Sequence, residues 1–267
     1  MTRAPDVLTE AALRAWPLPE PDPDGDKEER GRTLVIAGGP ELAGAALLSG
    51  TAALRAGAGK LQIATTRSVA ASLALAVPEA LVIGLPETAG GGLGEEGAAL
   101  LASMKVDSLL IGPGLQDEAA TVRFVRALLP TISASAIVLD AFAMAVVGEQ
   151  HSFRGPVLLT PHAGEMAKLT NTSKEDVLSD PASAALDAAR AWNATVALKG
   201  SVTWIATPQG RLWCHDGGNV GLGTSGSGDV LAGVIAGLAA RGAPLEQAAA
   251  WGVALHAKAG EMLADRL

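Results

Sequence analysis

Short apolar segments alternate with longer helical segments along almost the whole chain, and this alternation restricts the possible folds more than any other feature. The pattern predicts strands at 33–37, 60–65, 81–83, 108–111, 136–139, 157–159 and 196–198. It predicts helices between them at 42–56, 95–104, 118–129 and from after His162 to about Trp192. Continuous apolar strands joined through helices are typical of a mainly parallel sheet with helices on both faces. We therefore predict a single α/β domain.

The two ends of the chain depart from this alternation. Residues 17–31 are rich in Pro, Asp, Glu and Gly, which predicts a loop. Apolar segments at 202–206 and 212–214 flank a Pro-Gln-Gly turn and predict a hairpin, and helices are expected at 229–240 and 245–263. We place an N-terminal extension and loop at 1–32 and the folded domain at 33–267.

The composition disfavours several classes of partner. The chain has 267 residues, of which 49% are hydrophobic, so it can bury one large core. A net charge of −8 and the lack of Tyr argue against nucleic-acid binding. The single Cys214 rules out an internal disulfide and suits a reducing cytosol. No leader or membrane span is evident, since the longest weakly charged stretch, 42–59, is short and contains Arg55. We predict a cytoplasmic protein without a membrane partner.

Several predicted strands end in glycine-rich or polar tips. These tips are Gly38-Gly39, Gly112-Pro113-Gly114, Thr160-Pro161-His162 and Lys199-Gly200-Ser201. In open parallel sheets ligands bind outside the carboxyl ends of the strands. The four tips are therefore expected to share one functional edge.

A glycine-rich loop at 217–228 leads directly into an apolar helix, with Asp229 at the junction. Gly or Ser occupies eight of the positions 217–228. Such small residues allow the N–H groups of Gly226, Ser227 and Gly228 to point at one spot, beside the positive end of the helix dipole. The loop is therefore predicted to form an anion hole for a phosphate. Asp229 could instead be only a helix cap, but the loop is longer than a cap requires. It matches neither a Walker A loop nor a Rossmann fingerprint.

Five further motifs precede this loop in order: 44–48 with 53–59, 111–115, 139–141, 159–165 and 198–201. Together with Gly-Ser-Gly-Asp at a helix start, they resemble the ribokinase-like superfamily. Within it, the chain is similar to the ADP-dependent NAD(P)H-hydrate dehydratases, over nearly its whole length. The resemblance implies a ribokinase-like fold and an enzyme that repairs hydrated NADH or NADPH.

The resemblance also implies roles for individual residues. Asp229 would be the catalytic base at the hydrated nicotinamide. The hydrated dinucleotide would contact Gly44, Ala45, Gly114 and His162. The adenine nucleotide would be held by Lys199, Gly200, Ser201, Val202, Thr203 and Gly228. ADP or ATP would be the co-substrate, with Mg²⁺, in a homotetramer. Only about 30 residues precede the first predicted strand, so a separate epimerase is expected for the other hydrate isomer.

Some positions depart from the family pattern. The loop departs from the family pattern at five positions, and all of these changes except Val220 are small or conservative: Val220, Leu222, Gly223, Ser225 and Ser227. Phe142 replaces a second Asp after Asp140-Ala141, which removes a carboxylate that a metal or polar group could contact. The metal ligands are therefore left unassigned, while the chemistry at Asp229 is unaffected.

The expected reaction proceeds through phosphorylation. Asp229 would take the proton of the C6 hydroxyl, the oxygen would attack the terminal phosphate of ADP or ATP, and the ring nitrogen would then expel phosphate. A carboxylate beside a helix N-terminus is expected to have a low pKa. Two alternatives stay open: a kinase of the same superfamily acting on a thiazole or pyrimidine alcohol, and a nucleotide-binding sensor without activity.

The remaining polar candidates are weaker. His162 could be a simple loop histidine, and Lys199 a solvated strand-end lysine. His256 and Trp251 lie on a helix with Leu255 and Leu263, which favours packing. A structural zinc site is not expected, because no metal-ligand spacing connects His151, His215 and Cys214.

Overall fold

A computed structural model describes residues 4–149 and 152–266. The strands are β1 (Asp6–Val7), β2 (Arg32–Ile36), β3 (Lys60–Thr66), β4 (Ala80–Leu85), β5 (Ser108–Ile111), β6 (Ala136–Leu139), β7 (Val157–Leu159), β8 (Thr195–Leu198), β9 (Val202–Ala206) and β10 (Leu212–Asp216). The α-helices are α1 (Glu10–Arg14), α2 (Ala43–Ala56), α3 (Arg67–Ala76), α4 (Gly97–Leu101), α5 (Glu118–Leu128), α6 (Ala163–Thr170), α7 (Lys174–Ser179), α8 (Pro181–Trp192), α9 (Ser227–Ala240) and α10 (Leu245–Ala264). Two 3-10 helices are η1 (Ala141–Gly148) and η2 (Val220–Leu222).

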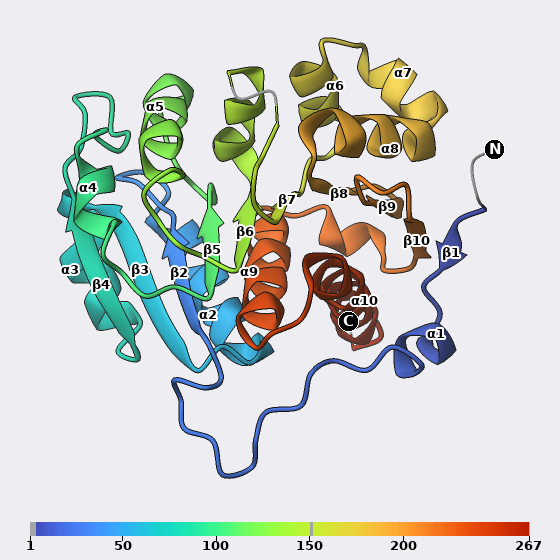
Figure 1. The fold of residues 1–267 in the computed structure, drawn as a ribbon, viewed down its shortest axis with the longest axis horizontal. Helices are drawn as coiled ribbons and strands as arrows, with labels where there is room; N and C mark the ends of the chain where they lie inside the picture. The colour runs from blue at the N-terminus through green and yellow to red at the C-terminus, as the bar shows by residue number, and fades with distance from the viewer. Residues whose placement is uncertain (1–3, 150–151, 267) are drawn as a thin grey trace.

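The strands form one sheet in the order β1-β10-β9-β8-β7-β6-β5-β2-β3-β4 (Figure 1). All neighbouring pairs are parallel except those of β9, which is antiparallel to both β8 and β10. The predicted mainly parallel sheet and the predicted hairpin at 202–214 are therefore confirmed.

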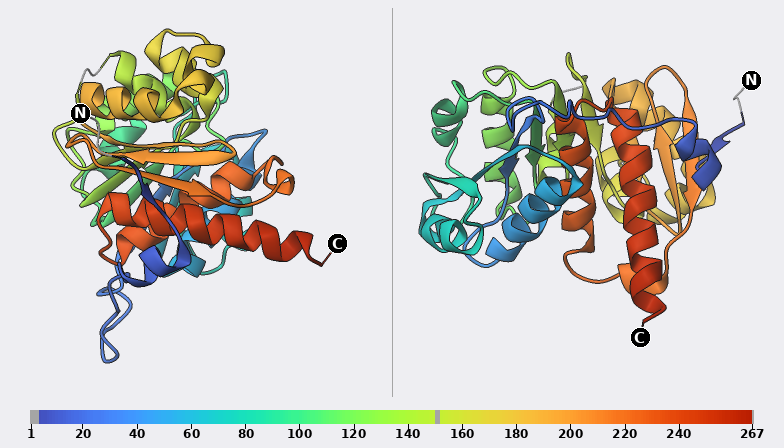
Figure 2. Two further views of the ribbon diagram at one scale, coloured as in Figure 1. Left: turned by 90° about the vertical axis from the view of Figure 1, so that its right-hand side faces the viewer. Right: turned by 90° about the horizontal axis from the view of Figure 1, so that it is seen from below.

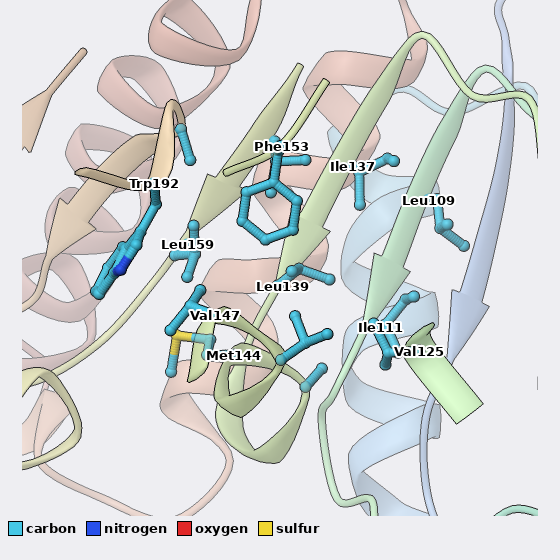
Figure 3. Close-up of a cluster of buried hydrophobic side chains, with 14 of the residues drawn as sticks. Leu109, Ile111, Val125, Ile137, Leu139, Met144, Val147, Phe153, Leu159 and Trp192 are labelled. Carbon is cyan, nitrogen blue, oxygen red and sulfur yellow. The ribbon is translucent and has the colours of Figure 1, made fainter. Parts of the chain in front are cut away.

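Two hydrophobic cores fill the two faces of the sheet, because successive side chains of a strand point to opposite sides. In β5, Leu109 and Ile111 join the core under α4 to α8, and Leu110 joins the core under α2, α9 and α10. Figure 3 shows part of the first core, where strand side chains meet Val125, Met144 and others from the covering elements. Strands buried on both faces explain the continuous apolar runs of the sequence.

The structure differs from the prediction at two predicted helices and at one helix that was not predicted. The predicted helix 95–104 is only the single turn and a half of α4, because a turn in which the Gly97 N–H donates to the Gly94 carbonyl precedes it and the helix begins at Gly97. The single helix expected before Trp192 is three helices: Asn171 ends α6 in the left-handed conformation, Ser173 caps α7 and Asp180 caps α8. Helix α3 was not predicted, and only Leu73 of its side chains is buried.

Residues 4–32 contribute to the same body. β1 pairs with β10 at the edge of the sheet, and Leu8 and Leu13 are buried in the core beneath α10. The indole of Trp16 stacks on that of Trp213 with 5.6 Å between ring centroids. Residues 17–31 then run as irregular loop, as predicted, to the start of β2. Figure 2 shows this loop and the C-terminal end of α10 extending from the body. No described helix is long and apolar enough to cross a membrane.

Candidate active site

The predicted strand tips share one edge of the sheet. β2, β5, β6, β7 and β8 are parallel neighbours in the sheet, so their carboxyl ends lie side by side. An isolated parallel bridge joins His162 to Lys199, which ties the tips of β7 and β8 together. Asp140, at the tip of β6, lies between the predicted tips and was not given a role from the sequence.

The glycine-rich loop brings the start of α9 to this edge. Gly226 is the residue before α9 and has a φ of 87°, and an added Cβ there would lie 2.6 Å from Leu48 of α2. The positive φ therefore favours glycine, and a larger residue would also have to displace the end of the Leu48 side chain. The N–H of Ser227 donates to the Thr224 carbonyl at 3.3 Å, whereas no described acceptor takes the N–H groups of Gly226 and Gly228. These two amides are free to bind an anion at the helix N-terminus.

Asp229 lies in the first turn of α9, as predicted, but its electrostatics differ from the expectation. The carboxyl is half-buried, and no described group donates a hydrogen bond to it. Burial, followed by the negative charge of Asp140, raises its pKa, while the cation of Lys199 acts in the opposite direction. The expected low pKa was wrong, because desolvation and a second carboxylate outweigh the helix terminus. Asp229 is therefore a stronger base than an ordinary aspartate.

Lys199 connects the tip of β8 to two other elements. Its Nζ lies 3.2 Å from Oδ1 of Asp140 and 3.9 Å from Oε2 of Glu165. The same Asp140 oxygen accepts a hydrogen bond of 2.6 Å from Thr160 Oγ1. An added Cβ at Gly228 would lie 3.7 Å from Nζ, so the ammonium faces the start of α9. The cation, the free amides and Asp229 therefore converge, as a phosphate site requires.

His162 caps helix α6. Its Nδ1 accepts hydrogen bonds from the N–H groups of Gly164 at 3.0 Å and Glu165 at 3.2 Å. Glu165 returns the interaction by accepting from the His162 N–H at 2.8 Å, which completes a capping box. Because Nδ1 is an acceptor, the neutral ring carries its proton on Nε2. The side chain is 59% exposed, so this Nε2–H is available to a ligand.

The residues expected around the hydrated dinucleotide lie on neighbouring elements. Gly114 has a φ of 64°, and an added Cβ would lie 2.5 Å from the Ala45 Cβ, so the two positions are in contact. Gly44, one residue earlier on α2, has nothing within 4 Å of the Cβ position. A ligand can therefore approach the exposed start of α2 closely.

The remaining residues expected around the nucleotide follow Lys199 along the chain. Gly200 and Ser201 form the exposed turn between β8 and β9, and Val202 begins β9 at this edge. Thr203 is buried in β9 opposite His215 of β10.

A cavity of about 710 Å³ opens at the opposite edge of the sheet, where the amino ends of β6, β7 and β8 meet the turn between α9 and α10. Its polar lining includes Arg154, Asn193 and Gln209. We assign the chemistry to the carboxyl edge, because the anion-binding amides, a cation and two carboxylates converge there.

Comparison with known proteins identifies the family. The sequence model of the NAD(P)H-hydrate dehydratase family matches residues 33–267. The chain belongs to this family.

Relatives of the family extend this comparison. An ADP-dependent (S)-NAD(P)H-hydrate dehydratase of Xanthomonas campestris is 49% identical over 97% of this chain and 89% of its own length. A bifunctional NAD(P)H-hydrate repair enzyme of Moorella thermoacetica is 42% identical over 96% of the chain, which spans only 49% of that relative. The crystal structure of the Bacillus subtilis ADP/ATP-dependent NAD(P)H-hydrate dehydratase, co-crystallised with ATP and Mg²⁺, superimposes with a TM-score of 0.83. It is 32% identical and covers 97% of this chain and 90% of its own. The predicted ribokinase-like dehydratase fold is thereby confirmed.

Two polar residues at the candidate site, Asp140 and His256, were not predicted from the sequence. Asp140 could have been found, because a carboxylate directly after a buried strand lies at the carboxyl edge. His256 was interpreted as a packing residue, yet its Nε2 lies 3.1 Å from Ser227 Oγ at the start of α9. Nothing in the sequence connects two residues on different helices. Trp251 does pack, with its indole N–H donating to the Trp16 carbonyl at 2.8 Å.

The other histidine and cysteine positions lie elsewhere. His215 Nδ1 is 3.1 Å from the Leu8 carbonyl oxygen, and Cys214 is a free, partly buried thiol. His151 lies outside the described residues. Across 4–149 and 152–266, no group of three or more His, Cys, Asp or Glu side chains is arranged to hold a metal ion.

Proposed function

We propose that this chain catalyses the ADP- or ATP-dependent dehydration of the S epimer of hydrated NADH or NADPH. The products are NADH or NADPH, phosphate, and AMP from ADP or ADP from ATP. One observation carries the proposal: a half-buried carboxylate of raised pKa, Asp229, lies beside free helix-terminal amides and the ammonium of Lys199. The names of the Xanthomonas and Bacillus relatives support the substrate and the nucleotide.

The chemistry begins with proton removal. Asp229 accepts the proton of the C6 hydroxyl as that oxygen attacks the terminal phosphorus of the nucleotide, and the bond to the leaving AMP or ADP breaks. The Gly226 and Gly228 amides and Lys199 stabilise the negative charge on the phosphoryl oxygens. The ring nitrogen lone pair then expels phosphate from C6, and loss of a proton from C5 restores the dihydropyridine. Hydroxide, a poor leaving group, is thereby replaced by phosphate.

The two ligands are assigned to neighbouring parts of the edge. The adenine nucleotide is bound by Lys199 to Thr203 and Gly228, beside the amides that face its terminal phosphate. The hydrated dinucleotide is bound by Gly44, Ala45, Gly114 and His162. The open space at Gly44 and the Nε2–H of His162 support this assignment. Asp229 lies where both must meet for the transfer.

Mg²⁺ is proposed to enter with the nucleotide. In nucleotide-transfer sites this ion is held mainly by phosphates and water, with one or two carboxylates, and it neutralises charge on the phosphoryl oxygens. The residues of this edge fit such an arrangement, since Asp140 is a carboxylate beside Lys199 that the proposed proton transfer leaves available. The Bacillus relative crystallised with ATP and Mg²⁺ supports it.

The reaction assay uses purified protein, ADP or ATP, Mg²⁺ and freshly prepared NADH-hydrate. Absorbance of the reduced nicotinamide should return with one phosphate released per molecule restored. Asp229→Asn keeps the size of the side chain but cannot accept the proton, so turnover should fall by about 10²- to 10⁴-fold while nucleotide binding persists. Full activity in this variant would remove Asp229 from the role of base.

The same assay decides between the proposed reaction and a kinase of the same superfamily. A kinase would share the amides and Asp229 but would release a stable phosphoester of a thiazole or pyrimidine alcohol. Formation of such an ester, with no action on the hydrate, would replace the present proposal. Absence of either product would favour a nucleotide sensor.

Assembly, location and a partner enzyme complete the proposal. The homotetramer and the cytoplasmic location implied by the resemblance stay predictions. The chain spans about half the length of the bifunctional relatives, whose name supports a second repair activity on the same metabolite. We propose that a separate epimerase converts the R hydrate to the S epimer used here.

A further inference from the structure

A histidine of α10 contacts the start of α9 at the phosphate site. His256 Nε2 and Ser227 Oγ are 3.1 Å apart. Ser227 is the first residue of α9 and lies between Gly226 and Gly228, whose amides are free. Helices α9 and α10 lie side by side against the sheet (Figure 1). The pair therefore belongs to the same helix terminus as Asp229, although the proposed mechanism gives it no role.

The environment of the imidazole disfavours its charged form. Burial, the largest effect, lowers the pKa of His256, a hydrogen bond with the Ser227 backbone opposes this, and the nearby cation of Lys199 lowers the pKa further. Ser227 directly precedes Gly228, whose Cβ position lies 3.7 Å from the ammonium of Lys199, so the Ser227–His256 pair adjoins the part of α9 to which the phosphate is assigned.

The hydrogen bond can run in two directions, and an anion distinguishes them. A neutral imidazole has one N–H donor and one acceptor nitrogen, and a hydroxyl has one proton to donate. If Ser227 donates to His256, the serine oxygen presents only lone pairs to the site and repels a phosphate. If His256 Nε2–H donates to Ser227 Oγ, the hydroxyl proton is free for a phosphoryl oxygen. A phosphate oxygen only accepts, so a bound phosphate favours the second direction.

We propose that the Ser227 hydroxyl is a further donor to the transferring phosphoryl group, oriented by the Nε2–H of His256. The proposal rests on the proposed function, and it makes Ser227 a catalytic residue and His256 a positioning residue. The side-chain donor complements the backbone donors at this terminus, because the Ser227 N–H is already bonded to Thr224. A hydrogen bond that only packs α9 against α10 would contribute to stability but not to turnover.

The first test is a set of variants measured in the dehydration assay with thermal unfolding alongside. Ser227→Ala and His256→Leu should each lower kcat by about tenfold to a hundredfold, since each removes a preorganised donor. The double variant should lose no more than the larger single loss, because the two residues act through one hydroxyl. His256→Gln, which can donate from its amide, and Ser227→Thr, which keeps the hydroxyl, should retain most turnover. Unchanged kcat in Ser227→Ala, or losses that multiply in the double variant, would overturn the proposal.

The second test needs no turnover and uses the imidazole nitrogens directly. The chain has four histidines, so ¹⁵N-histidine spectra can be assigned with single His variants. With saturating ADP and Mg²⁺, His256 should carry its proton on Nε2 and lose that pattern in Ser227→Ala. An unprotonated Nε2 in the ADP complex would mean that Ser227 donates to the ring, and would refute the proposed orientation.

The two experiments separate this inference from the function on which it rests. A wild-type protein that leaves the hydrate unchanged contradicts the proposed function, while the spectra still report the direction of the Ser227–His256 bond with ADP. An active wild type with an equally active Ser227→Ala variant contradicts only the role of the hydroxyl. If His256→Leu does not fold, Ser227→Ala and His256→Gln still test the prediction.

Discussion

Gly233 is the point at which the packing of the fold most directly sets the position of the active site. It lies on α9 one turn after Asp229, on the face that packs against α2 (Figure 1). An added Cβ at Gly233 would lie 2.2 Å from the Ser49 carbonyl oxygen, and Gly237 repeats this approach at 2.2 Å from the Ala53 carbonyl oxygen. Carbon and carbonyl oxygen need about 3.3 Å. Gly233→Ala therefore requires α9 and α2 to separate by roughly 1 Å, because backbone cannot rotate away as a side chain can.

Two effects of this substitution can be estimated. Overpacking costs about 1–3 kcal/mol, and the better helix propensity of Ala returns about 1 kcal/mol. Because the clash is with backbone, the cost lies at the upper end of this range, and the expected net loss of about 2 kcal/mol corresponds to a fall in Tm of about 4–8 °C for a domain of this size. Displacement of α9 also moves Asp229 and the free amides relative to Lys199, which follows β8. A misplacement of about 1 Å can cost about a hundredfold in rate.

The assay compares thermal unfolding and kcat of Gly233→Ala with those of Gly148→Ala. Gly148, at the end of η1, has nothing within 4 Å of its Cβ position, so its variant should match wild type in both measurements. A Gly233→Ala protein with wild-type Tm and wild-type kcat would refute the argument that close contact of α2 and α9 positions the site. A lower Tm with unchanged kcat would refute only the coupling of packing to catalysis.

Three further substitutions test the electrostatics and the caps of the site. Asp140→Asn keeps an acceptor for Thr160 but removes the negative charge that raises the pKa of Asp229. The acid limb of the kcat/KM profile should therefore move to lower pH. An unmoved limb would show that the charge of Asp140 does not affect the pKa of Asp229. The pKa of Asp229 is raised in the folded state, so the charged carboxylate costs stability once the pH exceeds the ordinary pKa of an aspartate. Asp229→Asn removes this cost, so the variant should have a higher Tm than wild type at about pH 7 and the same Tm at about pH 3. An equal Tm at both pH values would contradict the raised pKa. His162→Ala removes the cap of α6, so its free energy of unfolding in urea should fall by about 1 kcal/mol, whereas His162→Asn can still cap the helix and should lose less. Both variants should raise the KM for the hydrate more than the KM for ADP. The reverse ranking would remove His162 from the substrate site.

The sheet and its functional edge could be predicted from the sequence because they depend on local signals. Strands buried on both faces are continuous apolar runs, and their order of connection to helices fixes a parallel sheet. The glycine-rich loop before an apolar helix predicted the helix start within two residues, since α9 begins at Ser227. Helix α3 escaped prediction because its pattern carries little information: Leu73 is buried, but Leu75 is 86% exposed.

The parts of the site that could not be predicted depend on contacts between distant elements. The pKa of Asp229 is set by its burial and by Asp140, 89 residues earlier in the chain, and neither is visible in the residues beside it. The helix terminus alone suggested the opposite shift. The contact of His256 with Ser227 likewise depends on how α10 packs beside α9. The role of His162 as a cap needed the orientation of its ring, which a strand-end position does not fix.

The arrangement of charges at this edge gives its two carboxylates different roles. Asp140 is 4% exposed and directs one oxygen to both Thr160 Oγ1 and Lys199 Nζ. Asp229 is half-buried near the same cation but receives no hydrogen bond from a described residue. One oxygen of Asp140 is engaged by a hydroxyl and an ammonium, whereas Asp229 has a raised pKa and no such partner, which suits a base. Asp140 therefore holds Lys199 in place opposite the start of α9, and Asp229 is left free to act as the base.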